Sequence, residues 1–164
     1  GIPTVFNVLG PLSHPGQPLR QLIGAADPAL ADRMVEVFRA NDSVHTWVVT
    51  GHADLDEIAL TGPTRVLELR EGAVTEWTLD PTDLGLSLAD PVDLAGGGPD
   101  RNADIARALF DGSETGARRD IVALNAGAGL VVAGIADGIA DGLERAMAAL
   151  ADGSAGVVLD SISS

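Results

Sequence analysis

Cysteine and lysine are both absent from this chain of 164 residues. Without thiols the protein can form neither disulfides nor thiolate metal sites, so a bound metal would need oxygen or nitrogen ligands. The lack of cysteine is compatible with a reducing compartment, and we expect the cytoplasm. No apolar run approaches the roughly 18 residues that a membrane-spanning helix needs, so we expect no membrane partner.

Positive charge is also scarce. Ten arginines oppose 24 aspartates and glutamates, which gives a formal net charge of -14 at pH 7. Such a field repels nucleic-acid phosphates and anionic lipid headgroups, and we exclude both as partners. A phosphorylated substrate is disfavoured for the same reason unless a metal ion or local arginines offset the repulsion.

The start of the chain lacks an initiator methionine and any region resembling a signal peptide. It opens instead inside an apolar run, Pro3 to Leu9, which is closed by the turn residues Gly10 and Pro11. We therefore expect this sequence to begin in the middle of a larger enzyme.

The first part of the chain predicts a strand, a helix and a second strand. Residues Arg20–Ala25 alternate in polarity, and Asp27 is an N-cap residue followed by a proline at the first helical position. The helix from Pro28 to about Ala40 is amphipathic, and the β-branched residues of His45–Thr50 predict the second strand. The connection is long enough for a right-handed crossover, so we expect these two strands to be parallel.

An antiparallel hairpin and a helical region follow. Thr64–Arg70 and Ala73–Leu79 alternate in polarity on either side of a turn that contains glycine. The proline- and glycine-rich stretch 80–100 predicts a connecting loop. Helices are then expected over 100–110, 120–133 and 137–151, each introduced by an aspartate cap, with a short helix in the tail.

Acidic residues gather directly after the second predicted strand, at Asp54, Asp56 and Glu57. Open α/β sheets bind their ligands at this end of their strands. Carboxylate oxygens suit Mg²⁺, which keeps several waters and is bound by one or two carboxylates plus substrate phosphates. Asp56 and Glu57 are therefore the candidate Mg²⁺ ligands. Judged from spacing alone, a solvated acidic loop that caps a helix is the simpler interpretation.

Other chemistry-bearing residues give weaker signals. His14, His45 and His52 show neither metal-binding spacing nor a neighbouring nucleophile, so structural or surface roles are expected. Gly96–Gly98 follows no strand and lacks the lysine of a phosphate-binding loop, which favours a linker.

Two asparagines lie within apolar runs. Asn125 is expected to be a structural bridge, because a buried amide is costly unless it is hydrogen-bonded. Asn7 lies near Gly10 and Pro11, whose turn could approach a small molecule closely.

Four blocks of the sequence, taken together, resemble one enzyme family. In chain order they are 4–12 with His14 and Pro15, 55–58 with 61–64, Gly96 and Gly97 with Asn102 and Ala103, and 119–122 with 124–126. In this order they are similar to the carboxy-terminal half of anthranilate phosphoribosyltransferases. Departures from the family pattern, at 13–14, Gly127 and Gly129, are mild.

The resemblance implies transfer of the phosphoribosyl group from phosphoribosyl pyrophosphate (PRPP) to anthranilate, with release of pyrophosphate, in tryptophan biosynthesis. It implies that Asp56 and Glu57 bind a Mg²⁺ ion serving the pyrophosphate. Gly10 and Pro11 match a turn that borders the anthranilate channel, and Asn7 would brace it. No catalytic nucleophile or base is expected within the chain.

The family fold consists of a small helical domain and a larger α/β domain. The resemblance places residues 1–164 in the carboxy-terminal part of the latter, with a mixed, mostly parallel sheet flanked by helices and an antiparallel hairpin. The helical domain, the first part of the α/β domain and its glycine-rich diphosphate loop are then missing, so we expect this chain alone to be inactive. An unpaired sheet edge favours self-association, and a homodimer is expected.

Two other functions remain open. A pyrimidine nucleoside phosphorylase of the same superfamily would share the architecture, although the Asp56-Glu57 pair and the opening block argue against it. A non-catalytic paralogue could instead keep the fold as a binding or assembly module.

Overall fold

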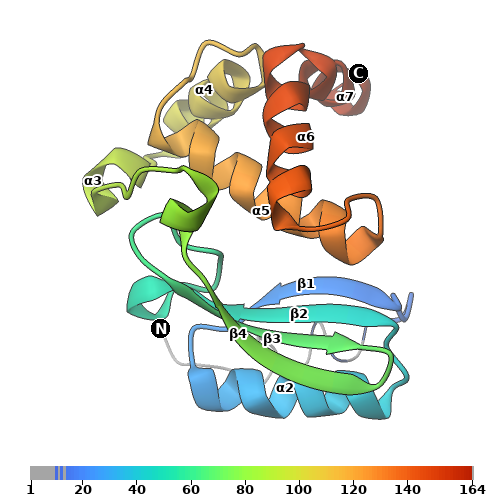
Figure 1. The fold of residues 1–164 in the computed structure, drawn as a ribbon. Coiled ribbons are helices and arrows are strands. Elements are labelled where there is room, and N and C mark those ends of the chain that lie inside the picture. The colour runs from blue at the N-terminus through green and yellow to red at the C-terminus, as the bar shows by residue number, and fades with distance from the viewer. Residues whose placement is uncertain (1–9, 11, 13, 164) are drawn as a thin grey trace. The chain divides into compact units, whose positions relative to one another are not determined.

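The computed structural model describes residues 10, 12 and 14–163 (Figure 1). The chain divides into two compact units. Unit 1 comprises Gly1–Ile58 and Pro63–Leu79, and unit 2 comprises Ala59–Gly62 and Asp80–Ser164. The assignment of all 164 residues to part of one α/β domain stays a prediction. Among the helices described, none is long and apolar enough to cross a membrane.

Unit 1 contains a four-stranded sheet with one long helix, α2, packed against it (Figure 1). In sheet order the strands are β1 (Arg20–Gly24), β2 (His45–Thr50), β3 (Thr64–Arg70) and β4 (Ala73–Leu79). Helix α2 (Pro28–Ala40) connects β1 to β2, and these two strands are parallel as predicted. The α/β class, the mixed sheet and the hairpin are thereby confirmed.

The expectation that most strands would be parallel is wrong for the described sheet, because β2–β3 and β3–β4 are both antiparallel. Only the connection from β1 to β2 contains a crossover helix, and parallel strands need such a connection. A two-residue turn joins β3 to β4. Its residues Glu71 and Gly72 both have positive φ, 52° and 79°, which matches the twist of a tight hairpin.

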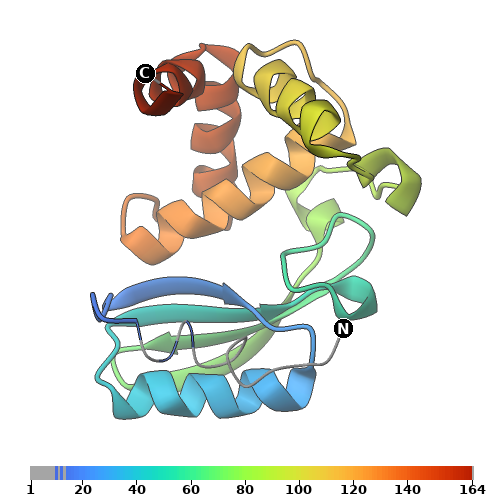
Figure 2. The same cartoon turned by 180° about the vertical axis from the view of Figure 1, so that it is seen from behind.

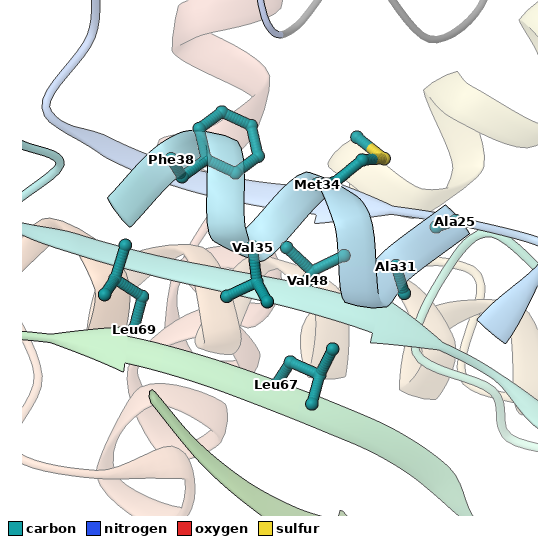
Figure 3. Packing of buried hydrophobic residues seen from close by; sticks show 8 residues of the cluster. All are labelled: Ala25, Ala31, Met34, Val35, Phe38, Val48, Leu67 and Leu69. Atoms are coloured by element: carbon teal, nitrogen blue, oxygen red, sulfur yellow. The ribbon is translucent and has the colours of Figure 1, made fainter. Parts of the chain in front are cut away.

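The core of unit 1 lies between α2 and one face of the sheet. Figure 3 shows Val35 of the helix pointing toward Val48 of β2 and toward Leu67 and Leu69 of β3. This cluster consists of Ala25, Ala31, Met34, Val35, Phe38, Val48, Leu67 and Leu69. Helix α2 begins as predicted, because the Asp27 side chain accepts a hydrogen bond from the Ala29 amide at 2.9 Å. The cluster fixes the sheet that carries the candidate site.

Unit 2 is helical (Figure 2). After the short 3₁₀ helix η2 (Pro81–Leu84), its helices are α3 (Pro91–Leu94), α4 (Pro99–Phe110), α5 (Ala117–Ala133), α6 (Ile139–Ala151) and α7 (Ser154–Ser163). The predicted tail helix is confirmed.

The stretch 80–100 is more ordered than the predicted loop. It holds η2 and α3, each of which begins with an aspartate cap followed by proline. Asp80 accepts a hydrogen bond from the Thr82 amide at 2.9 Å, and Asp90 accepts one from the Val92 amide at 3.0 Å. The prolines that indicated a loop therefore occupy first helical positions, where a missing N–H costs nothing.

The predicted aspartate caps of the longer helices are wrong. Glycines occupy the N-cap positions of α4, α5 and α6, at Gly98, Gly116 and Gly138. Asp100 and Asp120 lie inside the first turn instead, where a negative charge interacts favourably with the helix dipole.

Candidate metal-binding loop

The predicted acidic pair lies on a loop that leaves the carboxyl end of β2. Asp56 and Glu57 are both exposed, and neither belongs to a helix or strand. A closed turn precedes them, because the Gly51 amide donates to the Leu55 carbonyl at 2.7 Å. Ile58, which follows them, is fully buried. The two carboxylates are thus carried on a short segment that is anchored at both ends.

The closed turn has an unusual backbone. It contains the 3₁₀ segment η1 (His52–Asp54), in which Ala53 and Asp54 both have a φ of 59°. Residues other than glycine rarely adopt this left-handed conformation, which costs about 1–3 kcal/mol per residue. Such strain persists only where the surroundings fix it, and it is concentrated at ligand-binding segments.

The end of β1 lies against the backbone of this loop. A Cβ atom added to Gly24 would be 1.6 Å from the carbonyl oxygen of Asp56. Two hydrogen bonds hold the end of β1 to β2: the Ala25 amide donates to the Val49 carbonyl at 2.9 Å, and the Thr50 hydroxyl donates to the Ala25 carbonyl at 2.8 Å. The acidic loop therefore lies at the carboxyl ends of a parallel strand pair, where open α/β sheets bind ligands.

The contact between Gly24 and the backbone of the acidic loop was not predicted from the sequence. A glycine at the end of a strand often marks a close approach of another backbone segment, so a signal was present. The glycine alone does not indicate which backbone segment lies against it, because Asp56 is distant from Gly24 in the sequence.

The acidic loop offers carboxylate oxygens as possible metal ligands. Within residues 10, 12 and 14–163, no group of three or more histidine, cysteine, aspartate or glutamate side chains is placed to hold a metal ion. A closed structural metal site is therefore a poor fit to this loop. Two exposed carboxylates do fit Mg²⁺, which completes its coordination with water and substrate phosphates.

The predicted anthranilate-site residues are described only in part. Gly10 is exposed, and no described atom outside its immediate chain surroundings lies within 4 Å of a Cβ atom added to it. Asn7 and Pro11 lie outside the described residues. The roles of all three stay predictions.

The histidines occupy structural and surface positions, as expected. His45 is buried, and its Nε2 atom lies 2.8 Å from Oε1 of Glu68. His14 and His52 are exposed, and Nδ1 of His14 accepts a hydrogen bond from the Gly16 amide at 3.0 Å.

The glycine-rich segment before α4 is held by an asparagine. Oδ1 of Asn102 accepts from the Gly97 amide at 2.7 Å, and Nδ2 of Asn102 donates to the Gly97 carbonyl at 3.0 Å. The Gly97 amide is therefore engaged within the protein, which supports the linker interpretation over a phosphate cradle. Asn125 has the expected structural role, because Nδ2 donates to the Ile121 carbonyl at 3.0 Å within α5.

Residues 1–156 match the family model described as "Glycosyl transferase family, a/b domain". The chain belongs to this family of glycosyltransferases. The resemblance seen in the four sequence blocks is also confirmed, because the similar proteins reported next all carry the name anthranilate phosphoribosyltransferase.

The anthranilate phosphoribosyltransferase of Methylorubrum populi is 46% identical to this chain over 156 residues, and that of Roseiflexus castenholzii is 44% identical over 156 residues. These matches cover 95% and 94% of this chain and 46% of each relative. The chain thus spans about half the length of these relatives. Neither of the two open alternatives, a nucleoside phosphorylase or a non-catalytic module, is supported by these names.

Solved structures show the same likeness. The crystal structure of the enzyme from Thermus thermophilus matches with a TM-score of 0.87 and 38% identity, over 98% of this chain and 47% of that one. The enzyme from Saccharomyces cerevisiae, in complex with PRPP and Mg, matches with a TM-score of 0.85 and 27% identity, over 98% of this chain and 46% of that one.

Proposed function

We propose that the full-length protein transfers the phosphoribosyl group of PRPP to the amine of anthranilate and releases pyrophosphate, as a step of tryptophan biosynthesis. The observation that carries this proposal is the acidic pair Asp56-Glu57 at the carboxyl ends of β1 and β2, in a chain of this family. The similar yeast enzyme has been solved with PRPP and Mg, and with 4-fluoroanthranilate.

In this proposal the carboxylates of Asp56 and Glu57 hold Mg²⁺. When bound, the ion supplies positive charge that screens the diphosphate and stabilises the departing pyrophosphate. The chain has need of such a charge, because its net charge of -14 disfavours an anionic substrate. The hydrogen-bonded turn before the pair and buried Ile58 after it fix the backbone, so the carboxylates are presented with little reorganisation.

Anthranilate is proposed to bind beside Gly10 and Pro11, with Asn7 bracing their turn. The lack of a side chain at Gly10 allows a flat aromatic ring to approach the backbone closely. Because no protein nucleophile is invoked, positioning of the two substrates and electrostatic stabilisation would supply the rate acceleration.

We also propose that the protein acts in the cytoplasm as a homodimer. The absence of cysteine is compatible with a reducing compartment. In the described sheet β1 is an edge strand, and an edge strand can pair with another chain.

The test is an anthranilate fluorescence assay on the full-length protein with PRPP, with and without Mg²⁺. The double substitution Asp56→Asn and Glu57→Gln should lower kcat/KM by about 100-fold or more, as expected when a charge-stabilising group is removed. Asp93→Asn with Glu144→Gln is the matched control, because it makes the same change in charge at exposed positions of α3 and α6. Turnover without Mg²⁺, or full activity of the Asp56/Glu57 variant, would refute the proposal.

A further inference from the structure

We infer that Gly24 is a positioning residue for the Mg²⁺-binding pair. Its missing side chain lets the backbone of Asp56 lie against the end of β1, and this contact sets where the two carboxylates stand. The inference rests on the proposed function of Asp56 and Glu57. It adds to that function a residue at the end of β1, which has no side chain of its own.

The geometry leaves no room for any side chain at this position. A Cβ atom on Gly24 would lie 1.6 Å from the carbonyl oxygen of Asp56, 2.3 Å from its carbonyl carbon and 3.0 Å from its Cα atom. All three are backbone atoms, so no rotamer change can relieve the overlap. At Gly97 the corresponding overlap, 2.5 Å, is with the Cδ atom of the Arg101 side chain, which can swing away. At Gly24 the main chain itself would have to move by more than an ångström.

The contacts on either side of the overlap hold their own segments in place, so the main chain would move at the acidic pair. On one side, hydrogen bonds of Ala25 with Val49 and with the Thr50 hydroxyl hold the end of β1 in the sheet. On the other side, the hydrogen bond between Gly51 and Leu55 closes the turn before the pair, and a fully buried isoleucine follows the pair. Exposed Asp56 and Glu57 lie between these fixed points, so a displacement of the main chain at Asp56 would move the two carboxylates.

A side chain at Gly24 should therefore weaken metal binding specifically. Groups that hold metal ligands in place typically contribute about 10- to 100-fold to metal affinity or activity when they are altered. A displacement of about 1 Å in a reacting group can cost about 100-fold in rate. A glycine needed only for folding would instead lower the melting temperature and leave the dependence on metal unchanged.

The experiment compares full-length wild type with Gly24→Ala and with Gly142→Ala. The second variant is the matched control, because a Cβ atom on Gly142 in α6 also overlaps a backbone oxygen, that of Gly127 at 2.4 Å. Two quantities are measured below the unfolding temperature: the Mg²⁺ concentration that gives half-maximal activity, and Mn²⁺ binding in the presence of PRPP by electron paramagnetic resonance. Gly24→Ala should raise both the half-saturating Mg²⁺ concentration and the Mn²⁺ dissociation constant about tenfold or more. Gly142→Ala should lower the melting temperature and change neither.

Folded Gly24→Ala protein with the wild-type dependence on Mg²⁺ and Mn²⁺ would overturn the inference. If Gly24→Ala does not fold, Thr50→Val decides, because it removes only the hydroxyl that holds the end of β1. It should raise the Mn²⁺ dissociation constant about fivefold, the effect of one hydrogen bond, and an unchanged constant would overturn the inference. The Asp56→Asn, Glu57→Gln protein tests the metal role of the acidic pair separately from the role of Gly24. If this protein still binds Mn²⁺, the metal role of the pair is refuted. If it loses Mn²⁺ binding, the result for Gly24→Ala tests the role of Gly24 alone.

Discussion

Gly127 of α5 and Gly142 of α6 lie backbone to backbone where these two helices pack against each other. A Cβ atom added to Gly142 would be 2.4 Å from the carbonyl oxygen of Gly127, and one added to Gly127 would be 2.7 Å from the carbonyl carbon of Gly142. Both glycines are buried. Two helices can approach this closely only where neither carries a side chain, so this pair fixes how α5 packs on α6.

Two glycines of the same helix should respond to alanine in opposite directions. Gly127→Ala overpacks the contact between α5 and α6 and is expected to lower the free energy of unfolding by about 1–3 kcal/mol. Gly129→Ala should raise it by about 0.5–1 kcal/mol, because alanine favours a helix and, apart from the chain neighbours and the backbone of the same helix, no described atom lies within 4 Å of the new methyl group. Urea unfolding of both variants checks this pair. Equal effects of the two substitutions would show that this contact is not tightly packed.

Arg65 on β3 connects α2 with β4. Its Nη2 atom lies 2.7 Å from Oδ1 of Asp32 and 2.8 Å from Oε2 of Glu76, and its Nε atom lies 2.9 Å from Oε1 of Glu76. The hydrogen bonds from Arg65 hold the pKa of Glu76 below its ordinary value of 4.5. A carboxylate with a lowered pKa in the folded state stabilises the fold above its unfolded-state pKa, and this stabilisation is lost as the pH falls through the folded-state value.

The stability of wild type relative to Glu76→Gln should therefore depend on pH. We expect a constant advantage of wild type near neutral pH, which declines as the pH falls below 4.5. Urea unfolding of both proteins from about pH 7 to about pH 3 measures this difference in unfolding free energy. In an Arg65→Met background the same substitution should show a much smaller pH dependence, because the hydrogen bonds that lower the pKa are gone. An equal pH dependence in both backgrounds would contradict the assignment to Arg65.

The Glu68 side chain on β3 contacts one side chain on each neighbouring strand. Its Oε1 atom lies 2.8 Å from Nε2 of buried His45, and its Oε2 atom accepts a hydrogen bond from Nε1 of Trp77 at 3.2 Å. Glu68→Leu leaves both groups without this partner and should cost about 2 kcal/mol of unfolding free energy. Glu68→Gln keeps one acceptor oxygen, which can serve Trp77 or His45 but not both in the present arrangement, so it should cost about 1 kcal/mol.

Tryptophan fluorescence during denaturant unfolding measures both Glu68 variants. The chain contains two tryptophans, Trp47 and Trp77, whose rings stack edge to face with centroids 5.1 Å apart, so the signal reports on this face of the sheet. A Glu68→Gln protein as unstable as Glu68→Leu would show that the carboxylate charge matters more than the hydrogen bonds.

The 164-residue chain by itself is expected not to consume anthranilate. Its similar relatives are about twice as long, and the acidic loop supplies carboxylates but no positive side chain for the phosphates. Anthranilate fluorescence with PRPP and Mg²⁺ checks this, with the full-length protein as the positive control. Mg²⁺-dependent loss of fluorescence by the short chain would contradict the expectation.

Local signals in the sequence predicted most elements of unit 1. The strands β2, β3 and β4 have the predicted bounds, and α2 begins after its predicted aspartate cap. These features depend on side-chain alternation, turn residues and caps within a few positions, all of which a sequence shows directly. The acidic pair was predicted in the same way, from its place immediately after β2.

The direction of β3 and the surroundings of the acidic pair depended on tertiary structure. The local signals of Thr64–Arg70 predicted its hairpin partner β4 but not the strand on its other side, and the antiparallel pairing with β2 became clear only from the fold. The closeness of Gly24 to Asp56 is of the same kind, since it joins the end of one strand to the loop after another. A sequence determines such contacts through packing of the whole chain, which no short pattern encodes. By itself it determined which residues carry the carboxylates, and the tertiary structure decided what holds them in place.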